Sequence, residues 1–368
     1  MAPLPAFEFL PSRDRFTVLA SDYFEAREEF RGLVDLLRWP RVAYTISSCG
    51  PAGEELTIDV AWSDDRRDLP TLIISSGLHG VEGFFGSNAQ LHLLHDVGTR
   101  ELDPSGVRLV FMHALNPYGF AHVRRFDAEN IDPNRNFLLP GETFSGAPAG
   151  YAKLDSLLNP QSPQTAGDCF QLQAGLMVLR HGMPKLKQAI ATGQYEFPHG
   201  LFFGGHQPCE TQRILVRHLP NWITGAPRVL HFDLHTGLGK RGTGKLLLDS
   251  PLTPSQQIWI DQHLGADTYE GCYATGVAYQ ARGGFGPWCV ANSGVPDFLF
   301  ACAEFGTYSP LRVLAGLRAE NREHHWGEPG SASYVRAKRH LRELFDPGYD
   351  ALWIANRWVR QAIVGLAQ

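Results

Sequence analysis

One stretch decides the fold: Thr71-Leu-Ile-Ile-Ser-Ser-Gly-Leu-His79-Gly-Val-Glu82-Gly-Phe-Phe-Gly86. It predicts a buried strand that breaks at Gly77 and Gly80 and gives way to a helix. Such a turn lies at the carboxyl end of a sheet, where open α/β folds place their sites. Within the break, His79 and Glu82 offer an imidazole and a carboxylate, and both groups are ligands that zinc accepts. The stretch therefore predicts an α/β protein with part of a metal site.

The same spacing occurs again at His325-Trp-Gly-Glu328. A chain with this many His and Glu residues should show roughly one such pair by chance, so the spacing alone is weak evidence. The second copy lies in a stretch rich in Gly and Pro with no strand before it, and we expect it in a solvated surface loop. The preceding strand distinguishes the copy at His79.

The composition is that of a globular protein whose 368 residues can bury a large core. A formal net charge of -5 gives no electrostatic footprint for nucleic acid or an anionic membrane. No apolar run approaches the roughly 18 residues that span a bilayer, and the first residues do not follow the pattern of a secretory signal. The cysteines are scattered without a Cys-x-x-Cys pair, which is typical of reduced thiols. We therefore expect a cytoplasmic enzyme that binds neither nucleic acid nor membranes.

Strand and helix patterns alternate along the chain, which predicts one catalytic domain over residues 1–368. The expected fold is a three-layer α/β/α sandwich around a central mixed, mostly parallel sheet. A helical segment at about 15–38 precedes it, and a stretch rich in Gly, Pro and Gln at about 140–220 predicts an insertion over one end of the sheet. The expected strands are Val42–Ser47, Glu55–Trp62, Leu72–Ser76, Val107–His113, Arg228–Leu234 and Phe298–Glu304, and the expected later helices are Glu82–His95, Pro254–Leu264, Leu311–His324 and Asp350–Leu366.

A third metal ligand is suggested by Val229-Leu-His-Phe-Asp-Leu-His235-Thr-Gly. We expect His235 at the end of this strand, just before a glycine turn. Two ligands close in sequence and a third from a distant strand are the usual plan of a catalytic zinc site, which keeps a position open for water. The alternative is that His235 only caps a strand and bonds a turn.

An arginine-rich segment runs from Asn116 to Phe137 and includes Arg124, Arg125 and Arg135. Arginines that converge on one cleft can bind a carboxylate through two hydrogen bonds and neutralise a developing oxyanion. The alternative is a lattice of surface salt bridges.

A buried carboxylate is predicted by Phe298-Leu-Phe-Ala-Cys-Ala-Glu304-Phe-Gly-Thr-Tyr308. A carboxylate at the end of an apolar strand is costly unless it has a partner. Glu304 is therefore suited to act as a general base towards water. The alternative is a carboxylate beside the N-terminus of the following helix.

Together, these motifs resemble those of the zinc carboxypeptidase superfamily. More narrowly, the motifs around His79 and Glu304 resemble the bacterial DUF2817 branch of that superfamily. The motif around His235 resembles that of the related succinylglutamate desuccinylases and aspartoacylases. The resemblance implies one Zn²⁺ ion held by His79, Glu82 and His235, with Glu304 as general base and acid. It implies that Asn134 and Arg135 bind a substrate carboxylate, and that Arg124 or Arg125 polarises the scissile carbonyl. Arg124 fits the pattern slightly better. Asp132 matches the acid that orients His79.

One departure concerns the reaction. Carboxypeptidases carry a mobile tyrosine shortly after a Gly-Gly…Trp segment, whereas Gly283-Gly284-Phe-Gly-Pro-Trp288-Cys-Val290 places Val290 there. The expected activity is hydrolysis of a peptide or amide bond next to a free carboxylate. The alternative is deacylation of N-acyl amino acids.

Three other functional classes fit the sequence less well. Gly239-Lys-Arg-Gly-Thr-Gly-Lys245 nearly spells a phosphate loop, but Leu246 stands where a magnesium-binding hydroxyl is needed, and a strand follows. The Gly-x-Ser-x-Gly elbow of a serine hydrolase does not occur. A non-catalytic protein that binds metal or peptide is the third, although all four residue types of the expected site are intact.

Overall fold

The structure is a computed structural model and describes residues 20–165, 167–271 and 281–368. Its centre is an eight-stranded sheet in the order β1-β2-β4-β3-β5-β8-β6-β7. The strands are β1 (Arg41–Cys49), β2 (Glu55–Trp62), β3 (Thr71–Ser76), β4 (Arg108–His113), β5 (Val229–Lys240), β6 (Gly244–Leu248), β7 (Tyr269–Gly271) and β8 (Phe298–Thr307). The strands β4, β3, β5 and β8 are parallel neighbours, whereas β1, β2 and β6 join antiparallel. The predicted mixed sheet is confirmed.

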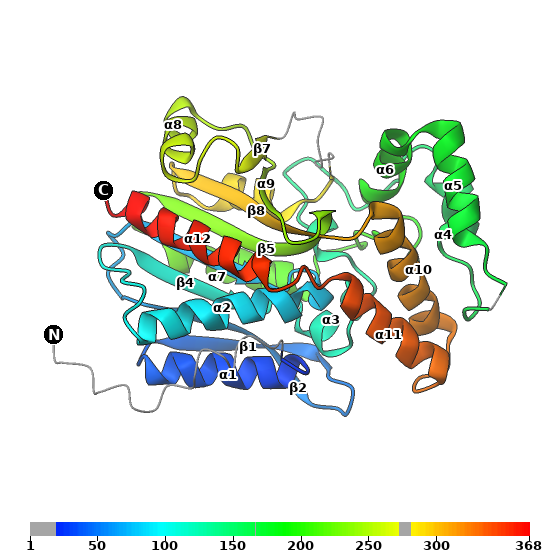
Figure 1. Cartoon of the computed structure of the whole chain (residues 1–368), viewed down its shortest axis with the longest axis horizontal. Helices are drawn as coiled ribbons and strands as arrows, with labels where there is room; N and C mark the ends of the chain where they lie inside the picture. Colours follow the sequence, from blue (N-terminus) through cyan, green and yellow to red (C-terminus); the bar gives the residue numbers. More distant parts are fainter. Residues whose placement is uncertain (1–19, 166, 272–280) are drawn as a thin grey trace.

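Helices cover both faces of the sheet (Figure 1). Among the described residues they are α1 (Tyr23–Leu36), α2 (Gly83–Gly98), α3 (Pro117–Ala121), α4 (Tyr151–Leu158), α5 (Phe170–His181), α6 (Met183–Ala191), α7 (Glu210–Ile223), α8 (Pro254–His263), α9 (Phe285–Asn292), α10 (Pro310–Trp326), α11 (Ala332–Leu344) and α12 (Asp350–Leu366). The apolar sides of α1, α2, α8 and α12 share one core cluster with the sheet, and those of α7 and α9 share another on its opposite face. The three-layer α/β/α class is confirmed.

Alternation along the central strands fills these two cores. Leu230, Phe232 and Leu234 of β5 lie in the cluster beneath α2 and α12. The residues between them point to the opposite face, because successive side chains of a strand alternate. A polar residue at every second position can therefore gather on one face while the strand stays buried.

The segment 140–220 divides into two parts. The helix α7 packs against the sheet through Leu215, Leu219 and Trp222 and belongs to the sandwich. The helices α4, α5 and α6 instead lie beyond the carboxyl ends of β5 and β8, beside α10 (Figure 1). Of the described helices in this segment, α4, α5 and α6 are therefore the ones at that end of the sheet.

Three sequence expectations need correction. The strand β5 continues beyond His235 to Lys240, and β8 continues beyond Glu304 to Thr307, so neither residue ends its strand. The second His-x-x-Glu copy is not wholly a surface loop, because His325 lies within α10 and is half-buried. The expected helix at 15–38 corresponds to α1, and residues before 20 lie outside the described part. Of the described helices, none combines the length and hydropathy needed to cross a membrane.

A buried histidine makes stability depend on pH. The His113 ring stacks on Phe30, with ring centroids 4.8 Å apart, and its Nε2 lies 2.9 Å from the hydroxyl of Ser87. Burial lowers the pKa of His113 to about 4. Because its pKa is higher in the unfolded chain, the unfolded state binds more protons between about pH 6.5 and 4. The stability contributed by the neutral ring is complete above pH 6.5 and is lost as the pH falls through that window.

Acidification from pH 7.5 to 5 should therefore lower the free energy of unfolding of the wild type by about 2 kcal/mol more than that of the His113→Gln variant. Denaturant unfolding of both proteins at the two pH values measures this difference. Other titrating groups are common to both proteins and cancel. A difference in unfolding free energy between the two proteins that does not change with pH would contradict the lowered pKa of His113.

Candidate metal centre

Two glycines shape the loop that carries His79 and Glu82. Gly77 has φ +65°, a backbone conformation that L side chains rarely adopt. A Cβ on Gly80 would lie 2.0 Å from the backbone of Gly119, so only glycine allows this approach. The loop leaves β3 and forms the 3₁₀ turn η2 (Gly80–Glu82) before α2 begins. Both potential ligands therefore stand on rigid backbone at the carboxyl edge of the sheet.

The strands β5 and β8 present their polar residues at every second position. His231, Asp233 and His235 share one face of β5, and Cys302 and Glu304 share the same face of β8. In the parallel register, His235 stands opposite Glu304 and Asp233 stands opposite Cys302. The strand pairing thus places the expected third ligand beside the expected general base.

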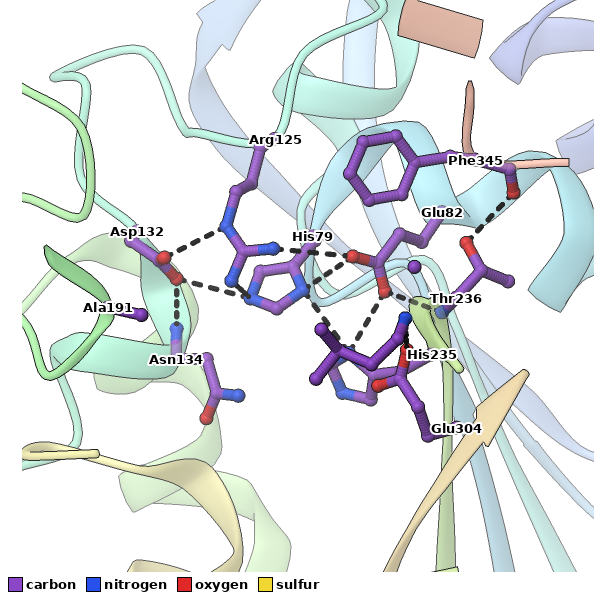
Figure 2. Close-up of polar contacts among 12 residues, drawn as sticks. His79, Glu82, Arg125, Asp132, Asn134, Ala191, His235, Thr236, Glu304 and Phe345 are labelled. Atoms are coloured by element: carbon purple, nitrogen blue, oxygen red, sulfur yellow. Dashed lines mark hydrogen bonds and ion pairs between the residues drawn. The ribbon is translucent and has the colours of Figure 1, made fainter. Parts of the chain in front are cut away.

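Three donor groups converge in the structure (Figure 2). Nδ1 of His79 lies 2.8 Å from Glu82 Oε1, Nδ1 of His235 lies 3.0 Å from Glu82 Oε2, and the two Nδ1 atoms are 3.2 Å apart. Ligand atoms about 2.1 Å from one tetrahedral zinc ion would be separated by about 3.4 Å. His79, Glu82 and His235 are all buried and could hold a metal ion.

The outer nitrogen of each imidazole faces a carboxylate. Nε2 of His79 lies 3.2 Å from Asp132, and Nε2 of His235 lies 2.6 Å from Asp233. When each Nε2 carries the proton, both Nδ1 lone pairs point at the same spot beside Glu82. In this form both rings could bind one metal ion, as in a histidine metal site. Without an ion, burial disfavours the charged form of His235, but the carboxylates of Asp233 and Glu82 outweigh it and raise the pKa of His235 well above its usual value.

A second group of possible ligands, His235, Cys302 and Glu304, fits a metal less well. Burial and the carboxylate of Glu304 raise the pKa of the Cys302 thiol well above its usual value. The thiolate is the form that binds metal, and the raised pKa disfavours that form of Cys302.

Two buried carboxylates in the site have opposite proton affinities. Burial favours the neutral form of Glu82, but the imidazoles of His79 and His235 outweigh it and hold the pKa of Glu82 well below its usual range. Burial and the negative charge of Glu82 raise the pKa of Glu304 to about 7. Glu82 is thus suited to bind a cation, and Glu304 is suited to exchange a proton near neutral pH.

The neighbouring arginines point in different directions. Arg125 donates from Nε to Asp132 over 2.9 Å, and its Nη2 lies 2.7 Å from Nε2 of His79 (Figure 2). Arg124 is fully buried and donates from Nε to Glu320 of α10 over 3.0 Å. Arg125 lines the pocket at the metal centre, whereas Arg124 is not among the described residues that line it. The slight sequence preference for Arg124 as the carbonyl-polarising residue is therefore at odds with its position.

One pocket of about 190 Å³ joins the expected site residues. His79, Glu82, Arg125, Asn134, Arg135, His235 and Glu304 all line it. Arg135 is fully buried, and its Nε and Nη2 donate to the carbonyl oxygen of Ala191 at the end of α6. Asp132 is held behind the wall by Arg125 and by the backbone N–H of Asn134. The arrangement offers a base, a metal-binding cluster and fixed positive charge within one cavity.

A sequence profile of the DUF2817 family, described as a protein of unknown function, matches residues 19–358. The chain belongs to this family. A search of curated protein sequences finds no significant match.

Among solved structures, this DUF2817 chain is similar to carboxypeptidase A from Helicoverpa armigera, with a TM-score of 0.51 and 13% identity over 91% of this chain and 77% of that one. It is also similar to thrombin activatable fibrinolysis inhibitor, with a TM-score of 0.51 and 12% identity over 97% and 78%. A more distant similarity, with a TM-score of 0.39 and 15% identity over 89% and 78%, is to succinylglutamate desuccinylase from Chromobacterium violaceum. The first two similarities show that the fold is carboxypeptidase-like.

Sequence reasoning missed the support behind His235. Asp233 accepts a hydrogen bond from the hydroxyl of Ser75 over 2.6 Å, and the Ser75 oxygen lies 2.7 Å from Nε2 of His231. Burial lowers the pKa of His231 to about 4, so its ring is neutral and can donate to that oxygen. The signal was available, because Asp233 and His235 are two residues apart on a strand and must share a face.

We expect the Asp233→Asn variant to bind zinc about 10-fold to 100-fold more weakly, because Asp233 fixes the orientation and tautomer of His235. Competition with a chromogenic chelator measures the affinity. Asp297→Asn is the matched control, since Asp297 pairs with Arg228 at the other end of the same two strands. Equal zinc affinity of the two variants would exclude this role for Asp233.

Proposed function

We propose that the chain is a metal-dependent amide hydrolase that cleaves an amide bond next to a free carboxylate. The observation that carries the proposal is the convergence of His79, Glu82, His235 and Glu304 on the pocket that also contains Arg125. A non-catalytic metal-binding protein would have no need for Glu304, a buried carboxylate that lines the same pocket but is not one of the three ligands.

The donor set is suited to zinc. Two imidazoles and one carboxylate are the protein ligands of a zinc hydrolase, and the outer nitrogens are already oriented by Asp132 and Asp233. We assign His79, Glu82 and His235 as the ligands of one ion. Bound zinc would supply Lewis acidity towards a carbonyl and lower the pKa of water.

Glu304 is the proposed general base and acid. The backbone N–H of Leu238 donates to its Oε1 over 2.7 Å and fixes the carboxyl group, whereas Oε2 accepts a weak hydrogen bond from the thiol of Cys302 over 3.9 Å and is the oxygen proposed for proton transfer. In this role, Glu304 takes a proton from the attacking water and delivers it to the leaving nitrogen.

Arg125 is the proposed stabiliser of the oxyanion. A protonated Nε2 of His79 donates to Asp132, so Nη2 of Arg125 cannot also donate to that nitrogen. The guanidinium group would then turn towards the pocket while its Nε keeps the bond to Asp132. An N–H group in that position meets the oxygen that becomes negative during attack.

The carboxylate of the substrate is assigned to Asn134 and Arg135. Both line the pocket, and the bonds of Arg135 to Ala191 hold its charge in place.

A specific observation favours deacylation of N-acyl amino acids over removal of C-terminal residues from peptides. Val290 lies in α9 and packs against the apolar core, and no tyrosine is among the described residues that line the pocket. The group that carboxypeptidases carry at this place is therefore missing from the described wall.

Metal analysis and a substrate panel test the proposal together. Protein purified without chelator should contain about one zinc ion per chain, and chelation should abolish hydrolysis until zinc is restored. The panel compares N-acyl amino acids with unblocked peptides, and each compound has a control in which the free carboxylate is converted to an amide. Loss of turnover in the amide controls supports the carboxylate requirement. Release of C-terminal residues alone would contradict the deacylase assignment, and metal binding without turnover of either set would contradict the hydrolase.

A further inference from the structure

The pocket has two unlike ends. Most of its polar groups come from η2, β5, β8 and the segment around Arg125 and Arg135, and Asp249, which follows β6, adds a further carboxyl group. The rest of its wall comes from α4, α5, α6 and α10, which lie together beyond the carboxyl ends of β5 and β8 (Figure 1). A cavity of this kind orients a ligand through a few polar groups and gains affinity from apolar contact.

The helical wall is apolar. Phe170, Ala174 and Met177 share one face of α5, and Leu314 and Leu317 share one face of α10. Among the described residues of these four helices that line the pocket, Lys187 is the one with a charged side chain. The side chains that these four helices present to the pocket are thus mostly apolar and offer few groups that could bind the successive amides of a peptide.

The apolar wall has two parts relative to the carboxylate-binding residues: α6 ends at Ala191 beside Arg135, whereas the part formed by α10 continues to Phe345. In Figure 2, Asn134 lies at the left near Ala191 and Asp132, whereas the Phe345 ring lies above Glu82. The Phe345 ring lies close to Gly237, where a Cβ would be 3.3 Å from Cε1 of the ring, and both residues line the pocket with α10. A substrate whose carboxylate is held at Asn134 and whose carbonyl reaches the metal centre would project its acyl group towards this side.

From this arrangement we infer that the acyl group of the substrate is an extended alkyl chain, so that the substrate class is N-acyl amino acids with medium or long aliphatic acyl groups. The inference rests on the proposed hydrolase function and adds the acyl preference. In the reaction, water adds to the acyl carbon and the C–N bond breaks. One proton of the water passes through Glu304 to the nitrogen, and a fatty acid and a free amino acid leave.

The first test measures binding without turnover. The zinc-loaded Glu304→Gln variant is titrated by calorimetry with N-acyl derivatives of one amino acid, from acetyl to dodecanoyl. Each methylene that enters the apolar wall should tighten binding roughly threefold to fourfold until the pocket is full. A parallel series keeps the acetyl group and lengthens the amino acid side chain instead, and this series should show a much shallower trend.

The second test narrows the pocket. Ala174→Trp on α5 fills the apolar end and should reduce the ratio of dodecanoyl to acetyl affinity at least tenfold. Gln173→Trp is the matched control, because it places the same side chain on the exposed side of the same helix. If Ala174→Trp fails to fold, Ala174→Leu and Leu314→Trp make the same comparison.

The outcomes separate this inference from the proposed function. Chelator-sensitive hydrolysis with affinity that does not depend on acyl length would overturn the inference and leave the hydrolase intact. A chain-length trend confined to the amino acid side chain would overturn it as well. Acyl-length-dependent binding by a zinc-loaded wild type that hydrolyses no amide would contradict the hydrolase and retain the binding site.

Discussion

Glu304→Gln should lower kcat for amide hydrolysis by about a hundredfold to ten-thousandfold, with little change in zinc content or in substrate affinity. The amide cannot accept the proton of water, and general base catalysis contributes effects of this size. The oxygen of the introduced amide can still accept the hydrogen bond from the N–H of Leu238, so the strand geometry is preserved. Steady-state kinetics, metal analysis and calorimetry on the same preparation check the three parts.

The stability of this variant provides the control. The folded protein buries the carboxyl group of Glu304 near a second carboxylate, which raises its pKa to about 7. A neutral amide avoids that cost, so the Tm of Glu304→Gln should equal or exceed that of the wild type. A variant that retains a third or more of the wild-type kcat would show that another group moves the proton.

The sequence was sufficient to predict the buried strands and the ligand set. Short apolar runs between glycine-rich turns predicted β3, β4, β5 and β8, because such runs are stable only inside a sheet covered on both faces. His79, Glu82 and His235 could be expected together, since the carboxyl ends of adjacent parallel strands meet at one edge. The strand ends were predicted less well, because β5 and β8 continue past their polar residues.

Other features depend on distant contacts that local patterns do not contain. The apolar face of α5 forms a pocket wall only because α10, well over a hundred residues later, lies beside it. The direction of each arginine side chain is set by its partner, Glu320 for Arg124 and Asp132 for Arg125. Adjacent residues on a loop have no periodicity from which such directions could be predicted. His325 was misplaced for a related reason, since α10 continues to Trp326 in spite of the Gly and Pro residues that follow.

Replacement of Arg125 by glutamine should therefore mainly lower the catalytic rate, whereas the same replacement of Arg124 should mainly lower the stability of the fold. Arg125→Gln removes the N–H groups proposed for the oxyanion and should lower kcat about a hundredfold to a thousandfold. Its effect on folding should be smaller, because the N–H groups of Asn134 and of His79 still reach Asp132.

Arg124→Gln should leave the chemistry largely intact and weaken the fold. Arg124 also donates to Asn130 in its own loop and to Asn321, and the bond to Asn321 joins the loop to α10. Its removal leaves Glu320 buried with Lys338 as its other partner, 2.6 Å away, so we expect a loss of about 3 kcal/mol of unfolding free energy.

Denaturant unfolding and kinetics on both arginine variants, at a temperature where both are folded, distinguish these roles. A loss of kcat in the folded Arg124→Gln variant that matches the loss in Arg125→Gln would reverse the assignment. The comparison is informative because the two positions differ by one residue and share a backbone segment, in which the carbonyl groups of Arg124 and Arg125 accept from the N–H groups of Val81 and Gly80. A shift of that segment would disturb the loop of His79 and Glu82 in either variant and would appear as lost zinc affinity. Retained zinc affinity together with separate losses of kcat and of stability would therefore locate each effect in the side chain itself.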